Sequence, residues 1–409
     1  MSAGNGAGKS ILISGAGIAG PALAYWLLRY GLQPTLIERA PRRRTGGYVI
    51  DFWGAGYDLT ERMGLLPAVL QAGYQVKEVR LVGATGRRIG GFDVQLFREA
   101  TQGRFTSLPR GDLAAILHRA IEGRAPTTFD DSVTRIEDGE TNALVHFARG
   151  PSRRFDIVIG ADGLHSVVRA LSFGAESRFE RSLGYTVAAF EVGGYRPRDE
   201  DVYLGYSVPG RQISRFSMRG DRTMFLFVAA DQAGLSVGGD QDLTAQKAYL
   251  RSRFDSPDWE CRQILAALEH SDDLYFDRVS QIRMEHWWKD HVALVGDAAF
   301  APSLLAGQGS ALAIIGGYVL AGEIARAVRR SQPIDTAFAA YERALRPFML
   351  HKQDAAAGFA VAFAPRTRLG IFLRNQVTKL MALPYVAKLA FGSSLLDKID
   401  LPDDSDLEP

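Results

Sequence analysis

The chain has 409 residues, of which 46% are hydrophobic and 23% are charged, as is usual for a globular protein. This length predicts roughly two or three domains. The net charge of +2 excludes the strong positive field that proteins use to bind nucleic acid. The single cysteine, Cys261, excludes internal disulfides and a cysteine metal cluster, so we expect a packed thiol and no metal site. We recognise no export signal and expect a cytoplasmic location.

The first predicted unit is a strand, a glycine-rich turn, a helix and a second strand. Residues 11–14 form an apolar run typical of a buried parallel strand, residues 21–30 are predicted as a helix, and residues 34–37 form the next strand. That strand ends at Glu38, whose carboxylate is placed to accept hydrogen bonds from a ribose. The turn between the first strand and the helix is Gly15, Ala16, Gly17, Ile18, Ala19 and Gly20.

This glycine pattern predicts a dinucleotide site, since each glycine has a separate task. Gly15 permits a tight turn, Gly17 leaves room for a pyrophosphate, and Gly20 lets the helix pack closely on the strand. The helix start then points its positive end at the phosphates. A turn that needs glycine only for packing, followed by a surface Glu, is the plain alternative. A signal or membrane segment over residues 11–28 is disfavoured because glycines and a proline interrupt it. Residues 6–10 imitate part of a phosphate-binding P-loop but precede the strand instead of following it.

After the second strand come a basic loop, residues 39–44, and a glycine pair that includes Gly47. The loop lies where Arg39 or a neighbouring arginine can meet an adenosine or a phosphate. A later capping signal places Arg110 at the entrance of a helix over residues 113–117. Further strands are predicted at residues 132–136, 143–148 and 155–159.

Residues 173–276 have a different character, being rich in alternating Phe, Tyr, Val and Arg, which predicts an antiparallel sheet. Residues 242–268 look helical. A strand at 292–295 then ends in Gly296 and Asp297, and a long helix is predicted over residues 310–330. Substrate-pocket side chains are expected from the aromatic residues of this sheet, although such residues more often form core. The candidates are Phe190, Tyr203, Phe216, Phe225 and Phe227.

The predicted fold class is therefore α/β. A Rossmann-like dinucleotide domain, residues 1–172 and 277–350, is interrupted by a mainly antiparallel β-sheet substrate domain, residues 173–276. A C-terminal helical segment with an acidic tail, residues 351–409, follows.

The tail contains apolar residues at helical spacing over residues 366–383, with basic residues between them. Such a helix can pack on the protein body or lie on a membrane surface. We expect packing, because the acidic residues 403–408 would repel anionic lipid, and we expect those last residues to be disordered.

Three separated motifs together resemble one family, the class A flavoprotein aromatic hydroxylases. These are FAD-dependent monooxygenases with the fold of p-hydroxybenzoate hydroxylase. The first motif is Gly15 to Gly20 with Glu38 and Arg39. The others are Ile159-Gly160-Ala161-Asp162-Gly163 with Ser166 and Arg169, and Leu294-Val295-Gly296-Asp297-Ala298-Ala299 with Gly307-Gln308-Gly309.

The resemblance implies one bound FAD, with NADPH or NADH as a co-substrate that binds and leaves. Glu38 would hold the adenosine ribose, with Arg39 near the adenine, and Arg110 would approach the ribityl or pyrophosphate groups. Asp162 resembles the residue said to serve both FAD and NADPH, and Asp297 would accept hydrogen bonds from the ribityl side. The remaining implied cofactor contacts are Gly15, Gly17, Ile18, Ala19, Gly20, Gly47, Gly296, Gly307, Gln308 and Gly309.

Two departures from the family pattern leave the catalytic residues unassigned. Phe300 stands where many members have His, and Ser303-Leu304 replaces the usual Pro-Pro. The glycine loop and the helix after it look most like the branch with tetracycline-inactivating monooxygenases. That branch carries an extra C-terminal helix near the substrate entrance, which residues 366–383 would supply. We expect His165, beside Asp162, to be a solvated loop residue.

The implied function is hydroxylation of an electron-rich aromatic or polycyclic small molecule. NAD(P)H would reduce the flavin, O2 would add to it, and the resulting flavin hydroperoxide would transfer the hydroxyl group. The alternatives are another flavin-dependent oxidoreductase, such as a dehydrogenase or reductase, or a flavoprotein that binds a ligand without turnover. A halogenase is disfavoured because Trp287-Trp288 lacks the signature of those relatives. The expected partners are the substrate and O2, without nucleic acid or membrane, and the chain is expected to be a monomer or homodimer.

Overall fold

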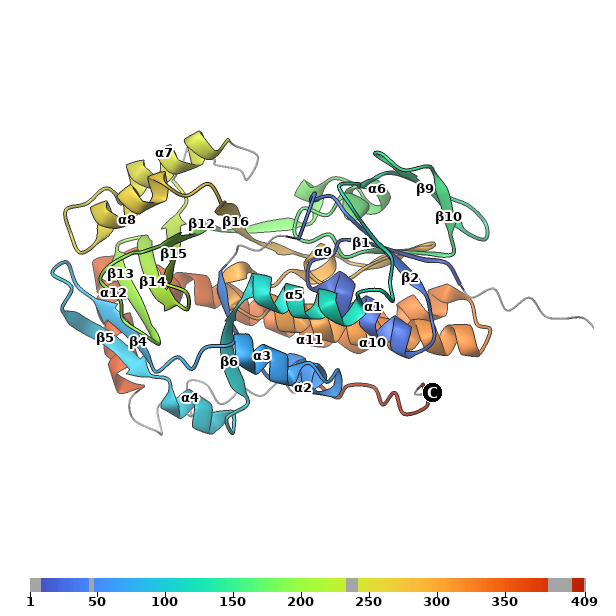
Figure 1. Cartoon of the computed structure of the whole chain (residues 1–409), viewed down its shortest axis with the longest axis horizontal. Helices are drawn as coiled ribbons and strands as arrows, with labels where there is room; N and C mark the ends of the chain where they lie inside the picture. The colour runs from blue at the N-terminus through green and yellow to red at the C-terminus, as the bar shows by residue number, and fades with distance from the viewer. Residues whose placement is uncertain (1–8, 44–47, 233–241, 382–398, 408–409) are drawn as a thin grey trace, which may run out of the picture.

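A computed structural model describes residues 9–43, 48–232, 242–381 and 399–407 (Figure 1). The fold is mixed α/β, as the sequence predicts, and its elements form two large sheets with helices around them. Gly47, one of the predicted cofactor residues, lies outside the described residues.

The first large sheet has six strands in the order β17-β18-β11-β1-β2-β7. Its central strands are parallel and fully or mostly buried, since apolar residues fill both faces. Its strands are β1 (Ile11–Ser14), β2 (Pro34–Glu38), β7 (Thr127–Phe129), β11 (Ile157–Gly160), β17 (Trp288–Lys289) and β18 (Val292–Leu294). The predicted strands at 11–14, 34–37 and 292–295 are thus confirmed.

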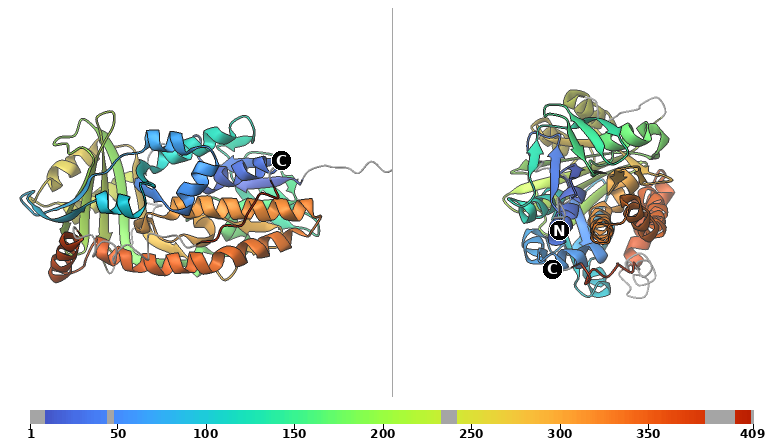
Figure 2. Two further views of the ribbon diagram at one scale, coloured as in Figure 1. Left: turned by 90° about the horizontal axis from the view of Figure 1, so that it is seen from below. Right: turned by 90° about the vertical axis from the view of Figure 1, so that its right-hand side faces the viewer.

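Helices α1 (Ala19–Arg29) and α10 (Gly309–Arg329) pack side by side against this sheet (Figures 1 and 2). Gly317 permits this contact, because a Cβ there would lie 2.9 Å from the backbone nitrogen of Leu23. Both helices begin within a residue or two of their predicted starts. α10 is long and apolar enough to cross a membrane, but 83% of its most apolar stretch is buried inside the protein. Within the described residues, α11 (Ile334–Phe363) and α12 (Arg368–Leu380) also pass that test, but only when the two are taken as one span bent by 108°.

The second large sheet has seven strands in the order β16-β12-β15-β14-β13-β4-β5. Its pairs are antiparallel except for β13 with β4. Its strands are β4 (Glu78–Val82), β5 (Arg88–Asp93), β12 (Glu180–Gly193), β13 (Val202–Val208), β14 (Arg211–Met218), β15 (Arg222–Ala230) and β16 (Leu274–Ile282). Two of these strands come from residues 78–93, ahead of the region that the aromatic alternation marks.

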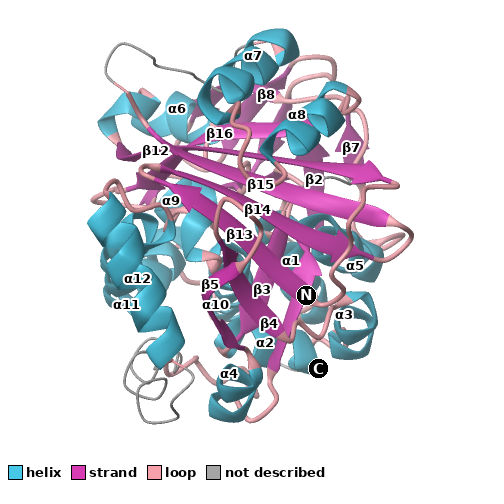
Figure 3. Cartoon of the chain, turned by 90° about the vertical axis from the view of Figure 1, so that its left-hand side faces the viewer, coloured by secondary structure: helices cyan, strands magenta, loops and turns pink. Residues whose placement is uncertain are grey.

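Helices α7 (Leu243–Phe254) and α8 (Cys261–Glu269) cover the outer face of the seven-stranded sheet (Figure 3). The predicted single helix over 242–268 is thus wrong, because the chain leaves the helical conformation between Asp255 and Glu260. Cys261, the first residue of α8, packs in the core between this helix and the sheet, as expected, and burial raises the pKa of its thiol to about 11.

Two smaller sheets and several short helices complete the body. The predicted strand 155–159 is split at Asp156, whose carboxylate accepts hydrogen bonds from the backbone and hydroxyl of Ser10. The small sheets are β3 (Val49–Trp53) with β6 (Phe105–Pro109), and β8 (Val133–Asp138), β9 (Ala143–Phe147) and β10 (Arg153–Phe155). The other helices are α2 (Ala55–Arg62), α3 (Leu66–Ala72), α4 (Gln95–Ala100), α5 (Arg110–Ile121), α6 (Val167–Phe173) and α9 (Asp297–Phe300), with 3-10 turns at Glu176–Arg178 and Leu304–Ala306.

The C-terminal part consists of α11 (Ile334–Phe363), α12 (Arg368–Leu380) and an ordered tail. The expected disorder of the acidic end is wrong for residues 403–407. Asp404 is buried, accepts a hydrogen bond from the Tyr30 hydroxyl at 2.5 Å and pairs with Arg62. Leu407 is buried in the core. The tail therefore closes over α1 and α10.

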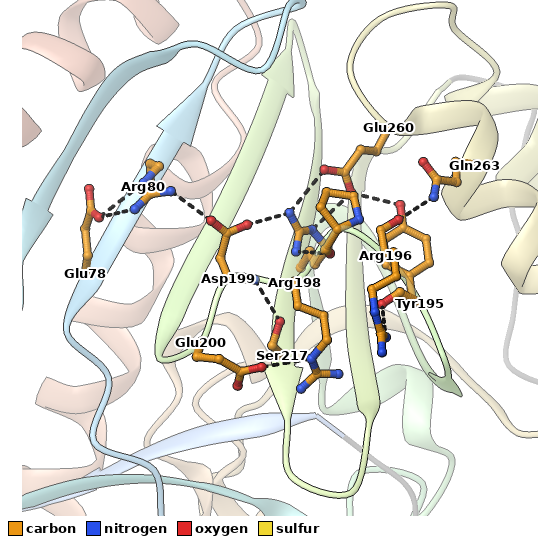
Figure 4. A network of polar contacts seen from close by, with 12 residues as sticks. Glu78, Arg80, Tyr195, Arg196, Arg198, Asp199, Glu200, Ser217, Glu260 and Gln263 are labelled. Carbon is orange, nitrogen blue, oxygen red and sulfur yellow. Dashed lines mark hydrogen bonds and ion pairs between the residues drawn. The ribbon is translucent and has the colours of Figure 1, made fainter.

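The seven-stranded sheet contains a buried arginine, Arg215 on β14, whose side chain is 1% exposed. Its guanidinium contacts Asp199 at 2.8 Å and Glu260 at 3.0 Å, and donates to the Pro197 carbonyl at 2.8 Å. Asp199 also pairs with Arg80 at 3.0 Å. Figure 4 shows the network around these carboxylates, which joins β4 to the start of α8. The network fixes the outer strands of the sheet to its helical cover.

Replacing Arg215 with methionine should destabilise the protein strongly. Arg215→Met keeps much of the side-chain volume but leaves Asp199 and Glu260 without their buried partner, so we expect the free energy of unfolding to fall by roughly 3 kcal/mol. Urea denaturation followed by circular dichroism measures this change. Arg181→Met, at an exposed position, is the control and should change stability by less than about 0.5 kcal/mol. Equal stabilities of the two variants would contradict the role of Arg215.

Candidate functional site

The glycine turn after β1 is shaped by close backbone approaches. Gly15 has φ +111°, and a Cβ there would lie 2.3 Å from the Ala161 carbonyl oxygen at the end of β11. A Cβ at Gly20 would lie 1.9 Å from the Gly15 carbonyl oxygen. Packing therefore requires both glycines. Gly17 differs, because a Cβ there would meet nothing nearer than the Arg110 guanidinium at 3.6 Å.

Two helix starts at this site have backbone N–H groups without side-chain caps. α1 follows Ile18 and α10 follows Gln308, and neither helix has an acidic residue in its first turn. The first N–H groups of a helix have no partner within the helix and carry partial positive charge. With the guanidinium of Arg110 beside Gly17, the α1 start is suited to an anionic group such as a pyrophosphate.

Glu38 lies at the end of β2, beside the glycine turn. One carboxylate oxygen accepts a hydrogen bond from the Ala16 backbone at 2.8 Å, and the other accepts one from Ala40 at 2.9 Å. The half-buried carboxylate is therefore held in one place, with lone pairs left for a ligand. Arg39, the next residue, is exposed.

Asp162, at the end of β11, is tied to the start of α6. Its carboxylate accepts hydrogen bonds from the Ser166 hydroxyl at 2.5 Å and the Val168 backbone at 3.1 Å. Burial raises its pKa, while the Ser166 hydrogen bond opposes the rise. Ser166 in turn caps α6 by accepting from the backbone of Arg169.

The Arg169 guanidinium is fully buried and connects two motifs. It donates to the Ala298 carbonyl at 3.0 Å and to the Leu164 carbonyl at 2.6 Å, and it pairs with Glu176 at 2.7 Å. Ala298 follows Asp297 on α9, so the end of β18 is held against the loop after β11.

Asp297 occupies the junction of α1, α9 and α10. Gly296, with φ +67°, brings this junction against α1, because a Cβ there would lie 2.9 Å from the Ala19 side chain. A Cβ at Gly309 would lie 3.4 Å from a carboxylate oxygen of Asp297. Burial raises the pKa of Asp297, and the positive charge of Arg110 opposes that rise. Asp297 thus faces the uncapped start of α10.

A small cavity opens beside Asp297, between the 301–310 loop and β16 of the seven-stranded sheet. Tyr48 and Tyr275 stand on its wall with ring centroids 5.8 Å apart, and Gly307 lies on the loop side. Ser303 also lines it, with φ +121° and a buried hydroxyl that has no partner in the described part of the chain. An unsatisfied buried hydroxyl costs about 1–3 kcal/mol, so this position favours a polar ligand group.

His165 is more tightly held than the sequence predicts. Its Nδ1 lies 2.9 Å from Glu176, and its Nε2 lies 3.1 Å from Asp277 on β16. It is an exposed loop residue, as expected, with 42% of its side chain exposed, but its ring is held between two carboxylates. Hydrogen bonds first to Asp277 and then to Glu176 raise its pKa to about 10.

The structure thus brings together most of the predicted site residues along one path. The path begins at Glu38, passes the glycine turn with Arg110, and ends at Asp297 and the cavity. Tyr48, Tyr275 and Ser303 were missed, because no local motif marks them and only the packing of two sheets brings them together. Phe190, Phe225 and Phe227 do not reach the cavity but stack beneath α7 and α8, and Tyr203 and Phe216 pack around Tyr74.

These features fit a long dinucleotide cofactor. Gly17 leaves open space beside a guanidinium and a helix start, and a carboxylate stands at the ribose end of the path. In the described residues, no group of three or more His, Cys, Asp or Glu could hold a metal ion. The class of protein that the fold and this site define is therefore a dinucleotide-binding protein with a discontinuous α/β sheet.

Comparisons with known proteins identify the family. Residues 9–350 match the FAD binding domain model. A flavin-dependent monooxygenase from an unknown prokaryotic organism is 35% identical over 348 residues, covering 83% of this chain and 86% of that protein. Another, from Legionella longbeachae, is 32% identical and covers 96% and 97%. The crystal structure of tetracycline destructase Tet(51) superposes with a TM-score of 0.81 at 30% identity, covering 97% of this chain and all of that one. The chain belongs to the class A FAD-dependent monooxygenases.

Removing the His165 imidazole should make stability less dependent on pH. Because the pKa in the folded state lies above the ordinary value, the histidine stabilises the fold fully below about pH 6.5, and this contribution is lost as the pH rises toward 10. The difference in urea midpoint between wild type and His165→Gln should thus be largest at pH 6 and smallest at pH 10. His351→Gln, at an exposed position, is the control. A difference that stays constant across this range would contradict the assignment.

Proposed function

We propose that this monooxygenase uses NAD(P)H and O2 to hydroxylate an electron-rich aromatic or polycyclic small molecule. One observation supports this proposal most. The ends of β1, β11 and β18 lie together with Arg110, and the path that they form leads to a cavity between the two sheets. A site of this shape can hold a cofactor along its length and a substrate at its end.

In this proposal the FAD-binding domain comprises residues 1–172 and 277–350. Residues 173–276 form the substrate domain, to whose sheet the earlier strands β4 and β5 also belong, and residues 351–409 form the C-terminal segment. Bound FAD supplies the hydride acceptance and oxygen activation, which no protein side chain can provide. Glu38 and Arg39 hold its adenosine, and Arg110, Asp162 and Asp297 hold its middle and ribityl parts. The remaining contacts come from Gly15, Gly17, Ile18, Ala19, Gly20, Gly47, Gly296, Gly307, Gln308 and Gly309.

The protein's own residues position the cofactor and the substrate and shield them from water. The start of α10 places partial positive charge beside Asp297, where negative charge on a ligand is stabilised. Tyr48 and Tyr275 give the cavity an aromatic wall, and Ser303 offers a hydroxyl to a polar ligand group. A flat aromatic substrate with oxygen substituents suits this wall. The likeness to tetracycline destructases supports polycyclic substrates and places antibiotic modification among the roles to test. We further propose a cytoplasmic location and a monomer or homodimer.

Stimulated NADPH oxidation tests the proposed function directly. Purified yellow protein is screened with phenolic and polycyclic compounds, tetracyclines included, and the mass of each product is measured by mass spectrometry. We expect at least one compound to speed NADPH or NADH oxidation and to gain one oxygen atom. Oxidation without oxygen transfer would indicate a dehydrogenase or reductase. Ligand binding without any NAD(P)H oxidation would indicate a flavoprotein that binds without turnover.

Replacing Glu38 should weaken FAD binding. Glu38→Ala removes charge-assisted hydrogen bonds to the ribose, so the binding free energy should weaken by about 2–4 kcal/mol, which raises the dissociation constant roughly 30- to 1,000-fold. Fluorescence titration of the stripped protein with FAD measures it. Asp130→Ala removes an exposed carboxylate near the same edge of the sheet and should leave the affinity unchanged. Unchanged affinity in Glu38→Ala would contradict the assignment.

Replacing Asp297 should affect both cofactor retention and reduction. Asp297→Ala is expected to weaken FAD binding by a similar amount and to slow flavin reduction by NADPH, because it removes the carboxylate at the α10 start. Stopped-flow absorbance of FAD-saturated protein separates the two effects. Asp297→Asn keeps the shape and the hydrogen-bonding oxygen and should retain more FAD than the alanine variant. Normal retention with normal reduction in Asp297→Ala would count against this role.

A further inference from the structure

Helix α12 exposes its apolar side and buries its polar side. The apolar stripe consists of five side chains at helical spacing, each more than half exposed. They are Leu369 (66%), Phe372 (57%), Leu373 (54%), Val377 (52%) and Leu380 (52%). The helix packs on the protein body, as expected, but it does so with its polar side, against β5. A soluble helix normally turns such a stripe toward the core, so an exposed stripe marks an interaction surface.

The buried side of α12 is fixed by polar contacts. Arg374 donates to the Phe363 carbonyl at 2.9 Å and to the Gln212 side chain at 2.9 Å. Thr378 accepts a hydrogen bond from the Gly91 backbone on β5 at 3.1 Å, and Asn375 is buried. These contacts set the rotation of the helix. The apolar stripe therefore faces outward because of how the helix docks.

The charge around the apolar stripe is positive. Residues 364–381 contain four Arg and Lys residues and no Asp or Glu. A shallow groove beside the stripe is lined by the basic rim, which we define as Arg211, Arg368 and Lys379. Arg88 also lines the groove, but its charge is paired with Glu78 at 3.0 Å. Apolar side chains bordered by Lys and Arg are the pattern of helices that lie in the interface of a bilayer. The positive border is complementary to anionic headgroups.

The acidic tail does not oppose this charge. The buried Asp404 is neutralised by Arg62, and the tail lies over α1 and α10. Figures 1 and 2 show α12 at one end of the long axis and the described tail, residues 399–407, well away from it. The electrostatic repulsion expected between the acidic tail and anionic lipid therefore does not act at α12.

We propose that α12 anchors this protein to an anionic lipid surface, with the apolar stripe among the upper acyl chains and the basic rim among the headgroups. A membrane suits the stripe better than a protein partner, because a stable protein interface buries about 800 Å² on each side and one short helix offers less. This proposal is independent of the proposed hydroxylation, since it concerns a surface at the far edge of the seven-stranded sheet.

Vesicle flotation of the full-length, FAD-loaded protein tests the anchor. We expect binding to phosphatidylcholine vesicles that contain phosphatidylglycerol, weaker binding to phosphatidylcholine alone, and loss of the difference at high salt. The double variant Phe372→Ser/Leu373→Ser should reduce partitioning by at least about tenfold. Leu171→Ser, an exposed apolar position on α6, should not. The FAD absorbance of each variant verifies that it is folded.

The basic rim is tested in the same assay. Arg368→Glu/Lys379→Glu should lower binding to the anionic vesicles by about tenfold or more and remove its salt dependence, whereas Arg124→Glu, exposed elsewhere, should have little effect. Equal binding of the stripe variant and wild type would overturn the proposal, and so would no binding of wild type to anionic vesicles. A wild-type dimer that dissociates in the stripe variant, without vesicle binding, would instead assign the stripe to an interface between two copies.

Discussion

The buried guanidinium of Arg169 is the interaction on which the arrangement of the site depends. It holds the loop after β11 against the loop after β18 through the Leu164 and Ala298 carbonyls. It also pairs with Glu176, which contacts His165, and His165 contacts Asp277 on β16. A fully buried cation is costly, and the guanidinium offsets this cost through three contacts, although its Nε has no partner among the described residues. This chain of contacts favours one relative position of both loops and the seven-stranded sheet.

The same constraint explains why a path and a cavity form where they do. Parallel strands end at one edge of a sheet, and in such sheets ligands bind outside the carboxyl ends of the strands. Here β1, β11 and β18 end together, and Gly15 and Gly296 allow their loops to touch their neighbours. The cavity lies where β16 meets these loops. The strand ends along the path and Tyr275 on the cavity wall therefore come from different sheets that one ion-paired network joins.

Local sequence predicted the parts of this site that depend on local chemistry. The glycine turn, the strand that carries Glu38 and the strand before Asp297 were recognised, because their backbone requirements restrict the residue types that fit. The pairing of β4 with β13 was not recognised, since residues 78–82 meet residues 202–206 only through long-range contacts. Tyr48 and Tyr275 were missed for the same reason. The order of the acidic tail was also missed, because composition cannot show that Asp404 meets Tyr30 and Arg62.

The orientation of α12 has a cause in the edge strand that it covers. β5 is the last strand of the seven-stranded sheet, and its free backbone groups need partners or a cover. Gly90 lets the helix approach closely, since a Cβ there would lie 3.2 Å from the Asn375 side chain. Only polar side chains such as Thr378 can satisfy the backbone there. The helix must therefore turn its polar side inward, which leaves its leucines outside. Amphipathic spacing thus predicted the helix, whereas the surface beneath it decided which side is buried.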